Sequence, residues 1–456
     1  MNDKCFYQNG EFLTFKKFCQ CVSRTRMAVR KISGNKVLLF DADSYQFSVW
    51  LFALIFEKKQ VLLPPNAQAG TLSQLAQECD ATAGTLELAG KKQIVVSNTD
   101  IAIDEVEYTR EQFFSLFTGE ITFFTSGSTG HAKAIRKSCR QLILEVDTLK
   151  CEFSTLFEHA NFIVSTVSHQ HIYGLLFKVL LPLSLGKNIV NQTFEYPEHI
   201  CRLFEELRAS SKLKQKSSLL LISSPAHLQR LVHDNVLAVN SEYFAGIFSS
   251  GGMLSLASSQ ALLRQMKISP TEVYGSTETG GIAWRCGQAS AAEPWQAFPN
   301  IKIQVSDKRQ RLEIFSPYVD EQPYITDDCV ELLDTQSFLL KGRVDRTVKI
   351  EEKRVNLTHI ERHLVEHPLV VEARIIVINN KSVSIRKILA AVLILTDKGQ
   401  ASLNNRGKLA LNNILKLHLL TDVERICLPK KWRYLSEYPY NSQGKLVLSD
   451  LEKLFD

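Results

Sequence analysis

Residues 121–133 read ITFFTSGSTGHAK, and this stretch gives the first functional hypothesis. An apolar β-run enters a loop of Thr, Ser and Gly, and a helix-like segment follows. Gly127 and Gly130 permit unusual φ angles and close approach of the backbone to a ligand. The hydroxyl groups and the lysine that can contact phosphate oxygens are Thr125, Ser126, Ser128, Thr129 and Lys133. The composition therefore indicates a phosphate cradle.

The same loop is not a P-loop of the Walker A type. That motif needs a lysine directly after its last glycine, whereas Gly130 is followed by His131. The loop therefore lacks the key residue of a P-loop phosphotransferase, an enzyme that would release ADP. Such an enzyme stays a weaker alternative, and a flexible turn without a function stays another.

Short apolar runs alternate with helical patterns along the first half of the chain. The paired strand-like and helical segments are residues 37–40 and 44–57, 61–63 and 71–79, 162–166 and 172–182, and 219–223 and 226–233. This rhythm predicts βαβ units, and therefore an α/β fold in which helices cover both faces of a largely parallel sheet. Ligand-binding loops follow the strand ends of such sheets.

The pattern of predicted elements changes beyond about residue 300, where strand-like runs and turns dominate. We expect a large domain of βαβ-layered sheets over residues 1–344 and a small mobile α+β domain over residues 346–456, with a hinge near Asp345. Residues 346–456 contain 19 lysines and arginines against 12 aspartates and glutamates, a net charge of +7, whereas the whole chain carries +6. This excess is either a solvated face or a docking surface for an anionic partner. Nucleic acid is disfavoured, since no Arg/Lys run with interleaved aromatics occurs.

Bulk properties exclude several protein classes. Hydrophobic residues make up 45% and charged residues 22% of the chain, as in globular proteins and unlike disordered or fibrous ones. The N-terminus lacks the pattern of a secretory signal, which predicts a cytoplasmic protein. The most apolar stretch, residues 47–56, is too short to span a membrane and should form a buried helix. Ten cysteines and eleven histidines show no zinc or redox spacing, so we expect reduced thiols and no structural metal.

A second polar turn lies in residues 271–281, TEVYGSTETGG, where a strand-like run enters a Gly/Ser/Thr loop. Tyr274 could stack on a base, and Glu278 could hold Mg²⁺ through its carboxylate oxygens. Either residue alone is more often a packing group or a solvated charge.

Two further segments complete the pattern. Residues 324–354 contain Asp328, a carboxylate suited to ribose hydroxyls, and the junction Gly342-Arg343-Val344-Asp345 with its glycine and alternating charge. Residues 438–446, YPYNSQGKL, form a turn that presents Lys445. A lone lysine on a turn is usually solvated.

In this order and spacing, the segments resemble the adenylate-forming superfamily of acyl- and aryl-CoA synthetases, peptide-synthetase adenylation domains and luciferases. The resemblance covers residues 37–446 and is weakest in the first hundred residues. It implies an enzyme that uses ATP and Mg²⁺ to convert a carboxylic acid into an acyl-adenylate, with release of pyrophosphate. A pantetheine thiol, of CoA or of an acyl carrier protein, would then accept the acyl group.

The resemblance also implies roles for individual residues. Lys445 would contact the carboxylate and the α-phosphate, and Glu278 with Thr129 would hold Mg²⁺. Asp345 would be the hinge about which the small domain rotates between the two half-reactions. The implied ATP-binding residues are Thr125, Ser126, Gly127, Ser128, Thr129, Gly130, Lys133, Gly251, Gly252, Tyr274, Gly275, Ser276, Thr277, Asp328 and Arg343. The implied pocket residues are His171, Tyr173, Gly174, Ser250 and Gly280.

The substrate class is narrowed by His171, which begins a segment similar to the family's gating segment. Relatives that adenylate amino acids usually carry an aspartate there, to pair with the substrate ammonium. Its absence disfavours α-amino acids and favours an aryl or fatty acyl carboxylate. An amino acid stays an alternative substrate, and a purely structural histidine stays an alternative role.

Three positions depart from the family pattern. His131 stands where proline is usual, Asp327 replaces the glycine before Asp328, and Glu352 occupies a glycine position near the thiol entrance. A carboxylate at that entrance would repel the phosphates of CoA, which favours a carrier protein as the acceptor. The length is also similar to that of compact ligases that load aryl or acyl starters onto carrier proteins. Asp327 and Glu352 leave open a degenerate member that binds nucleotide without turnover.

Overall fold

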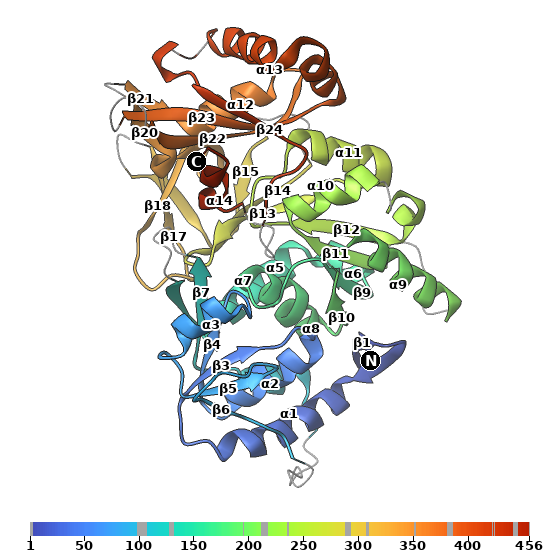
Figure 1. Ribbon diagram of the computed structural model, residues 1–456. Coiled ribbons are helices and arrows are strands. Elements are labelled where there is room, and N and C mark those ends of the chain that lie inside the picture. Colours follow the sequence, from blue (N-terminus) through green and yellow to red (C-terminus); the bar gives the residue numbers. More distant parts are fainter. Residues whose placement is uncertain are drawn as a thin grey trace. The chain divides into compact units, whose positions relative to one another are not determined.

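A computed structural model shows the chain as two compact units (Figure 1). Unit 1 comprises Met1–Ile301 and Phe315–Gln322, and unit 2 comprises Lys302–Ile314 and Pro323–Asp456. The structure describes residues 3–97, 107–126, 132–194, 196–210, 218–234, 237–287, 293–306, 310–350, 353–380, 386–421, 423, 425–440 and 446–455. The predicted hinge residue Asp345 lies within unit 2, in the short 3₁₀ turn Val344–Arg346, and its role in motion stays a prediction.

One sheet of unit 1 has the strand order β6-β5-β3-β4-β7-β8. Its strands are β3 (Lys36–Phe40), β4 (Gln60–Leu63), β5 (Ala81–Gly84), β6 (Lys92–Gln93), β7 (Glu120–Ser126) and β8 (Ala132–Ser138). β3 pairs in parallel with β4 and β5, and β4 pairs in parallel with β7. Helices α2 (Ser44–Phe56) and α3 (Ala69–Leu75) connect successive parallel strands, as the alternating pattern predicts.

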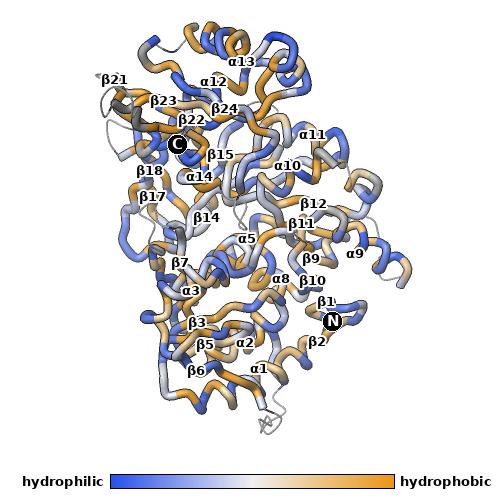
Figure 2. The backbone as a smooth tube through the Cα atoms, viewed as in Figure 1, coloured by the Kyte–Doolittle hydropathy of each residue, from blue (hydrophilic) through white to orange (hydrophobic). Residues whose placement is uncertain are grey.

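Helix α2 is the buried apolar helix expected at residues 47–56. Oδ1 of its N-cap residue, Asp43, accepts hydrogen bonds from the backbone N–H groups of Tyr45 and Gln46 at 2.8 and 3.0 Å. All of its residues except Gln46 and Phe56 are buried, so its polarity follows no helical stripe, and Figure 2 shows it as mostly hydrophobic. Within the described ranges no helix is long and apolar enough to cross a membrane.

The prediction of a helix directly after the phosphate-binding loop is wrong. Residues 132–138 form strand β8, antiparallel to β7, with Thr125 opposite Lys133. Ile135 and Lys137 both point inward from β8, the two-residue period of a strand. The helix, α5 (Cys139–Glu152), begins only after Ser138, which forms a capping box with Gln141.

A second sheet of unit 1 has the order β15-β14-β13-β12-β11-β9-β10-β1-β2. Its strands are β1 (Lys4–Gln8), β2 (Glu11–Thr14), β9 (Phe162–Ser165), β10 (Asn188–Thr193), β11 (Leu219–Ser223), β12 (Phe244–Ser249), β13 (Thr271–Ser276), β14 (Gly280–Cys286) and β15 (Trp295–Ala297). The centre is parallel, with Leu221 opposite both Val164 and Ile247, and β13 turns back antiparallel into β14. The predicted α/β fold with a largely parallel core is therefore confirmed.

Helices pack around this sheet and supply much of the core. They are α1 (Phe15–Arg30), α4 (Arg110–Ser115), α5, α6 (Ser154–His159), α7 (Ile172–Gly174), α8 (Leu181–Leu185), α9 (Pro197–Ala209), α10 (Pro225–Asp234) and α11 (Leu256–Met266). The helical pattern expected over residues 172–182 is present as α7, a π-helical stretch (Leu175–Leu180) and α8. A buried cluster joins α9 and α10 to the strands through Ile200, Phe204, Leu221 and Leu228.

Unit 2 is the smaller part of the chain, and its architecture is α+β. The boundary predicted at residues 344–346 lies inside this unit, so the predicted domain bounds stay a prediction. Its strands are β16 (Lys302–Val305), β17 (Arg311–Phe315), β18 (Tyr324–Leu332), β19 (Ser337–Arg343), β20 (Thr347–Ile350), β21 (Lys353–Asn356), β22 (Val370–Asn380), β23 (Arg386–Leu395) and β24 (Lys431–Leu435). Its helices are α12 (Leu357–Val365), α13 (Asp397–Leu419) and α14 (Leu448–Glu452). Ile360, Ile375, Leu393 and Leu415 belong to a core that joins α12 and α13 to the sheet of β22, β23 and β24.

Candidate functional site

The two strands that flank the predicted phosphate loop are ordered by their pairing. β7 and β8 stay in register up to Ser126 opposite Ala132, so the loop leaves from the end of a paired hairpin. Gly127, Ser128, Thr129, Gly130 and His131 lie outside the described residues, as does the side chain of Ser126. Their contacts with phosphate therefore stay predictions, and the site is built from the residues on either side.

An ion pair joins the two Gly/Ser/Thr segments of unit 1. Lys133 Nζ, on β8, donates to Glu278 Oε1, in the turn between β13 and β14, at 2.8 Å. Burial alone would raise the pKa of the Glu278 carboxyl, but hydrogen bonds from Lys133 and from the backbone hold that pKa below its ordinary value. Glu278 is thus an anion beside the predicted phosphate loop, where it could ligate a cation.

Lys137 supports the same turn from below. Its ammonium is buried and donates to the carbonyl oxygens of Glu278 and Tyr318, each at 2.6 Å. Burial lowers the pKa of Lys137, against the attraction of Glu145, Asp320 and Glu278. A buried cation that donates to two carbonyl oxygens holds the backbone of the turn that carries Glu278 in place.

Glu145, on α5, holds the far end of the turn. Its Oε1 accepts a hydrogen bond from the backbone N–H of Gly281 at 2.7 Å. Burial raises the pKa of Glu145 to about 7, an effect that the Gly281 N–H and the charge of Lys137 reduce. Gly280 adopts a φ of +68°, and a Cβ there would lie 2.6 Å from Glu145 Oε2. Both the backbone angle and the close carboxyl group favour glycine at this position.

The turn itself is closed by its own side chains. Ser276 N–H donates to Thr279 Oγ1 at 3.0 Å, and Thr279 N–H donates to Ser276 Oγ at 3.2 Å. At Gly275 a Cβ would meet the carbonyl oxygen of Gly280 at 2.2 Å. Thr277, between Ser276 and Thr279 in the chain, is half-buried. The backbone of residues 275–281 is therefore shaped before any ligand binds.

Two predicted ligand-contacting groups lie next to this turn. The ring of Tyr274 is half-buried at the end of β13 and packs at a tilt against Trp295, with 5.5 Å between centroids. Ser250 Oγ donates to the carbonyl oxygen of Val273 at 2.8 Å, which ties the segment after β12 to β13. Gly251 and Gly252 follow Ser250 and are exposed. Ser250, directly after β12, is thus held against β13, the strand that carries Tyr274.

The predicted acyl-pocket residues lie at and within α7 of unit 1. His171 precedes α7 and Tyr173 lies on it, and both side chains are half-buried. The ring of Tyr173 lies 5.0 Å from that of Phe177. Burial raises the pKa of Tyr173 well above its ordinary value, so the phenol is neutral. Gly174 has no room for a side chain, because a Cβ would lie 2.0 Å from the carbonyl oxygen of Ser168.

In unit 2, Asp328 and Arg343 lie opposite each other on β18 and β19. Arg343 Nη1 is 3.6 Å from Asp328 Oδ1, and its Nη2 is 3.5 Å from Asp327 Oδ2. The side chain of Arg343 is 46% exposed, so both ion pairs are long and solvent-screened. The side chain of Asp345, and Glu352 and Lys445 altogether, lie outside the described residues.

Comparisons with known proteins show what the chain is similar to. A family model described as AMP-binding enzyme matches residues 120–314, which include both polar turns of unit 1. A 4-coumarate–CoA ligase of Halorhodospira halophila is 28% identical over 334 residues, 73% of this chain and 76% of that protein. Malpinin synthetase of Mortierella alpina is 35% identical over 132 residues, 29% of this chain and only 2% of that protein. ATP-bound MatB from Rhodopseudomonas palustris has the same fold, with a TM-score of 0.79 at 16% identity over 100% of this chain and 96% of that one.

The chain belongs to the adenylate-forming superfamily.

For this adenylate-forming chain, the structure brings together within unit 1 the predicted residues Lys133, Tyr274, Gly275, Ser276, Thr277, Glu278 and Gly280. Within unit 2 it brings together Asp328 and Arg343. His171, Tyr173 and Gly174 form a separate group around α7. The role of each residue in catalysis or binding stays a prediction.

Sequence reasoning missed Lys137 and Glu145, the two buried charges behind the turn. Lys137 lies 141 residues from the carbonyl that it binds, and Glu145 lies 136 residues from Gly281. The only local signal was polarity at inward positions, a lysine on a strand and a glutamate on the covered face of a helix. Such positions are rarely charged without a partner, so the pattern itself indicates a buried network.

Proposed function

We propose that this adenylate-forming chain is an AMP-forming acid–thiol ligase. It would activate an aryl or fatty acyl carboxylate with ATP and Mg²⁺, release pyrophosphate, and pass the acyl group to a pantetheine thiol. The observation that carries the proposal is the ion pair between Lys133 and Glu278, because it unites two polar turns far apart in the sequence. A pre-shaped turn with an anion for Mg²⁺ beside a cation for phosphate suits a nucleotide triphosphate.

The chemistry asks mainly for charge stabilisation. The substrate carboxylate attacks the α-phosphorus while pyrophosphate leaves, and the transition state gathers negative charge on the equatorial oxygens. Glu278, with Thr129, would hold Mg²⁺, which neutralises part of that charge when bound. Lys133 and Lys445 would supply cations, and Tyr274 would stack on the adenine. Asp328 would hold the ribose, Arg343 would help to position the nucleotide, and Asp345 would act as a hinge.

Carboxylate-dependent exchange between ATP and pyrophosphate tests the adenylation step. Over a panel of aryl and fatty acids we expect exchange with at least one acid, its loss on chelation of Mg²⁺, and AMP, not ADP, as product. Lys445→Ala should reduce exchange by a factor of roughly 100 or more, because the cation acts on the reacting groups. Lys453→Ala is the matched control, since Lys453 is exposed and pairs with Asp450. Equal exchange by the wild type and Lys445→Ala would contradict the proposal.

An apolar acid is the proposed substrate class. Tyr173 and Phe177 pack together beside His171, and Phe177 lies 5.0 Å from the ring of Phe248. This aromatic surround suits an aryl or acyl chain better than an ammonium group. Peptide-synthetase relatives keep an amino acid as the alternative. Exchange with amino acids but with no aryl or fatty acid would favour that alternative.

A carrier-protein pantetheine is the proposed acceptor. Residues 346–456 carry a net charge of +7, which would attract an acidic carrier protein, whereas Glu352 would repel the phosphates of CoA. Glu352→Gly should therefore lower the KM for CoA, and leave pyrophosphate exchange unchanged. Unchanged or weaker use of CoA by this variant would contradict the assignment of Glu352.

A second candidate is a member that binds nucleotide without turnover. The observation that favours it is the competition of Asp327 and Asp328 for the single guanidinium of Arg343. ATP binding measured by calorimetry, with no AMP released over a long incubation, would support this candidate. Restoration of turnover by Asp327→Gly would show that Asp327 is the cause.

A further inference from the structure

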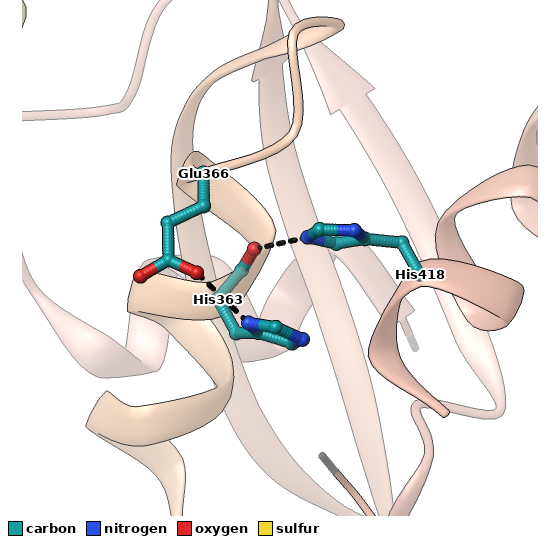
Figure 3. A group of neighbouring side chains, drawn as sticks. All are labelled: His363, Glu366 and His418. Atoms are coloured by element: carbon teal, nitrogen blue, oxygen red, sulfur yellow. Dashed lines mark hydrogen bonds and ion pairs between the residues drawn. The ribbon is translucent and has the colours of Figure 1, made fainter. Parts of the chain in front are cut away.

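Histidine and glutamate side chains gather in unit 2 where the ends of α12 and α13 meet (Figure 3). His363 lies on the last turn of α12, Glu366 directly follows that helix, and His418 lies on the last turn of α13. None of the three belongs to the polar turns or to the predicted nucleotide residues. They form the group of potential metal ligands found among the described residues.

The three side chains already face one another. His363 Nδ1 is 2.9 Å from Glu366 Oε2, and His418 Nε2 donates to the backbone carbonyl of His363 at 2.8 Å. The rings of His363 and His418 stack, with 4.5 Å between centroids and 16° between planes. One ligand atom from each of the three residues lies within 4.8 Å of the other two. Modest side-chain rotations would bring them to about 3.4 Å, the spacing on a tetrahedral zinc ion.

Two more imidazoles lie beside this group. His359 precedes His363 by one helical turn, with their rings 6.4 Å apart, and His367 lies with its ring 5.0 Å from that of His418. Residues 359–367 thus read HIERHLVEH, with histidines four residues apart. His359 and His363 share one face of α12, and His367 follows the end of that helix. The motif was missed in the sequence because its partner, His418, is 55 residues away.

The donor set selects the kind of ion. Two imidazoles and one carboxylate suit Zn²⁺, Ni²⁺ or Cu²⁺, whereas Mg²⁺ and Ca²⁺ prefer oxygen ligands alone. Solvent can reach the group, since the side chain of Glu366 is 57% exposed and that of His363 is 15% exposed. The stacked imidazoles lie close to each other, and a bound cation would accept their lone pairs jointly.

We propose that His363, Glu366 and His418 bind a transition-metal ion, with Zn²⁺ preferred and water completing the coordination. The ion would join the end of α12 to the end of α13, two helices that are linked in the chain only through β22 and β23. It would therefore stabilise unit 2. Since protons compete for the same imidazoles, binding would weaken as the pH falls.

The test is a titration of the full chain, reduced and freed of metal, with Zn²⁺ and with Co²⁺ in the absence of ATP. We expect one site per chain, and at least a 10-fold loss of affinity in His363→Ala and in His418→Ala. The matched control is His159→Ala, because His159 is an exposed histidine on α6 of unit 1. Equal affinity of the wild type and the His363→Ala/His418→Ala double variant would overturn the proposal.

Two further measurements guard against other causes. Cys151 and Cys286 are exposed thiols, but a Co²⁺ complex of imidazoles and carboxylate lacks the intense sulfur-to-cobalt absorption band. A thiolate band in the wild type would overturn the assignment. If the alanine variants fold poorly, Glu366→Gln replaces only an exposed carboxylate; it should weaken Zn²⁺ binding and the rise in Tm that Zn²⁺ causes in the wild type. Unchanged values in Glu366→Gln would remove Glu366 from the site.

Discussion

The polar turn of unit 1 and the acid–arginine pair of unit 2 are built in opposite ways. In unit 1, Glu278 belongs to a turn that buried Lys137 and Glu145 hold through backbone groups at 2.6 to 2.7 Å. In unit 2, Asp328 and Arg343 meet across two strands at 3.6 Å, with the arginine half in solvent. The groups of unit 1 are thus held rigidly, whereas the pair of unit 2 is held loosely.

The two regions therefore differ in how much their stability depends on the groups that would contact a ligand. A buried ammonium with two carbonyl acceptors is costly to disturb, because each orphaned acceptor loses a hydrogen bond without gaining water. A solvent-screened ion pair contributes little to stability, so its charges stay available to a ligand. Substitutions in unit 1 should therefore change stability and activity together, whereas those at Arg343 should change activity alone.

The largest effect is expected at Lys137. Lys137→Met keeps the length of the side chain but leaves the carbonyl oxygens of Glu278 and Tyr318 without their donor. We expect the free energy of unfolding to fall by about 2 kcal/mol. A displaced turn should also slow pyrophosphate exchange by roughly 100-fold. Urea denaturation and the exchange assay measure the two quantities.

Lys150→Met is the control for this substitution. Lys150 is exposed on α5, so its replacement should change the free energy of unfolding by no more than about 0.5 kcal/mol. If Lys137→Met were as stable and as active as Lys150→Met, the turn would not depend on the buried ammonium, and the contrast between the units would disappear.

The second effect is expected at Arg343 and has the opposite character. Arg343→Ala should leave the free energy of unfolding within about 0.5 kcal/mol of the wild type. The KM for ATP should rise by roughly 10- to 100-fold, the loss of one charge-assisted contact. Lys341→Ala, on the same strand β19 and paired with Glu331, should change neither quantity. A large loss of stability in Arg343→Ala would show that the pair is structural.

The smallest effect is a pH dependence that comes from Glu145. Burial raises the pKa of its carboxyl to about 7 in the folded protein, above its value in an unfolded chain. The folded state therefore binds the proton more tightly, and the stability from this group is present at low pH and is lost as the pH rises through about 7. The slope should approach about 1.4 kcal/mol per pH unit at most.

Glu145→Gln removes the titration but keeps an oxygen for the Gly281 N–H. As the pH rises from 5 to 8, the wild type should lose stability relative to this variant. Chemical denaturation at several pH values measures the difference. A constant difference across this range would mean that Glu145 does not titrate there.

The sequence predicts the parallel strands and their helices well, because periods of hydrophobicity are local properties. The helix predicted over residues 44–57 and the strand predicted over residues 219–223 are both present. A buried helix and a buried strand can be told apart by their length and by the polar residues that flank them. Strand β8 did not, because Ala, Lys and Arg favour helices locally and only pairing with β7 makes them a strand.

The site was predictable only in part. Tyr274, Glu278, Asp328 and Arg343 follow from motif resemblance. Their supports, Lys137 and Glu145, do not, because contacts across more than a hundred residues leave no local period. His363 and His418 were missed for the same reason. A single sequence reveals a pair of metal ligands only when both residues belong to one short motif.

The closed space at Gly275 and Gly280 has a consequence for anyone who wishes to redirect this protein to another acid. A side chain at either position would strike a backbone carbonyl or the buried Glu145 carboxylate, so a mutant library that randomises them would return mostly misfolded chains. Diversity is better placed at His171, which is half-buried and precedes a helix of three residues. Protein engineering should therefore leave these two glycines unchanged.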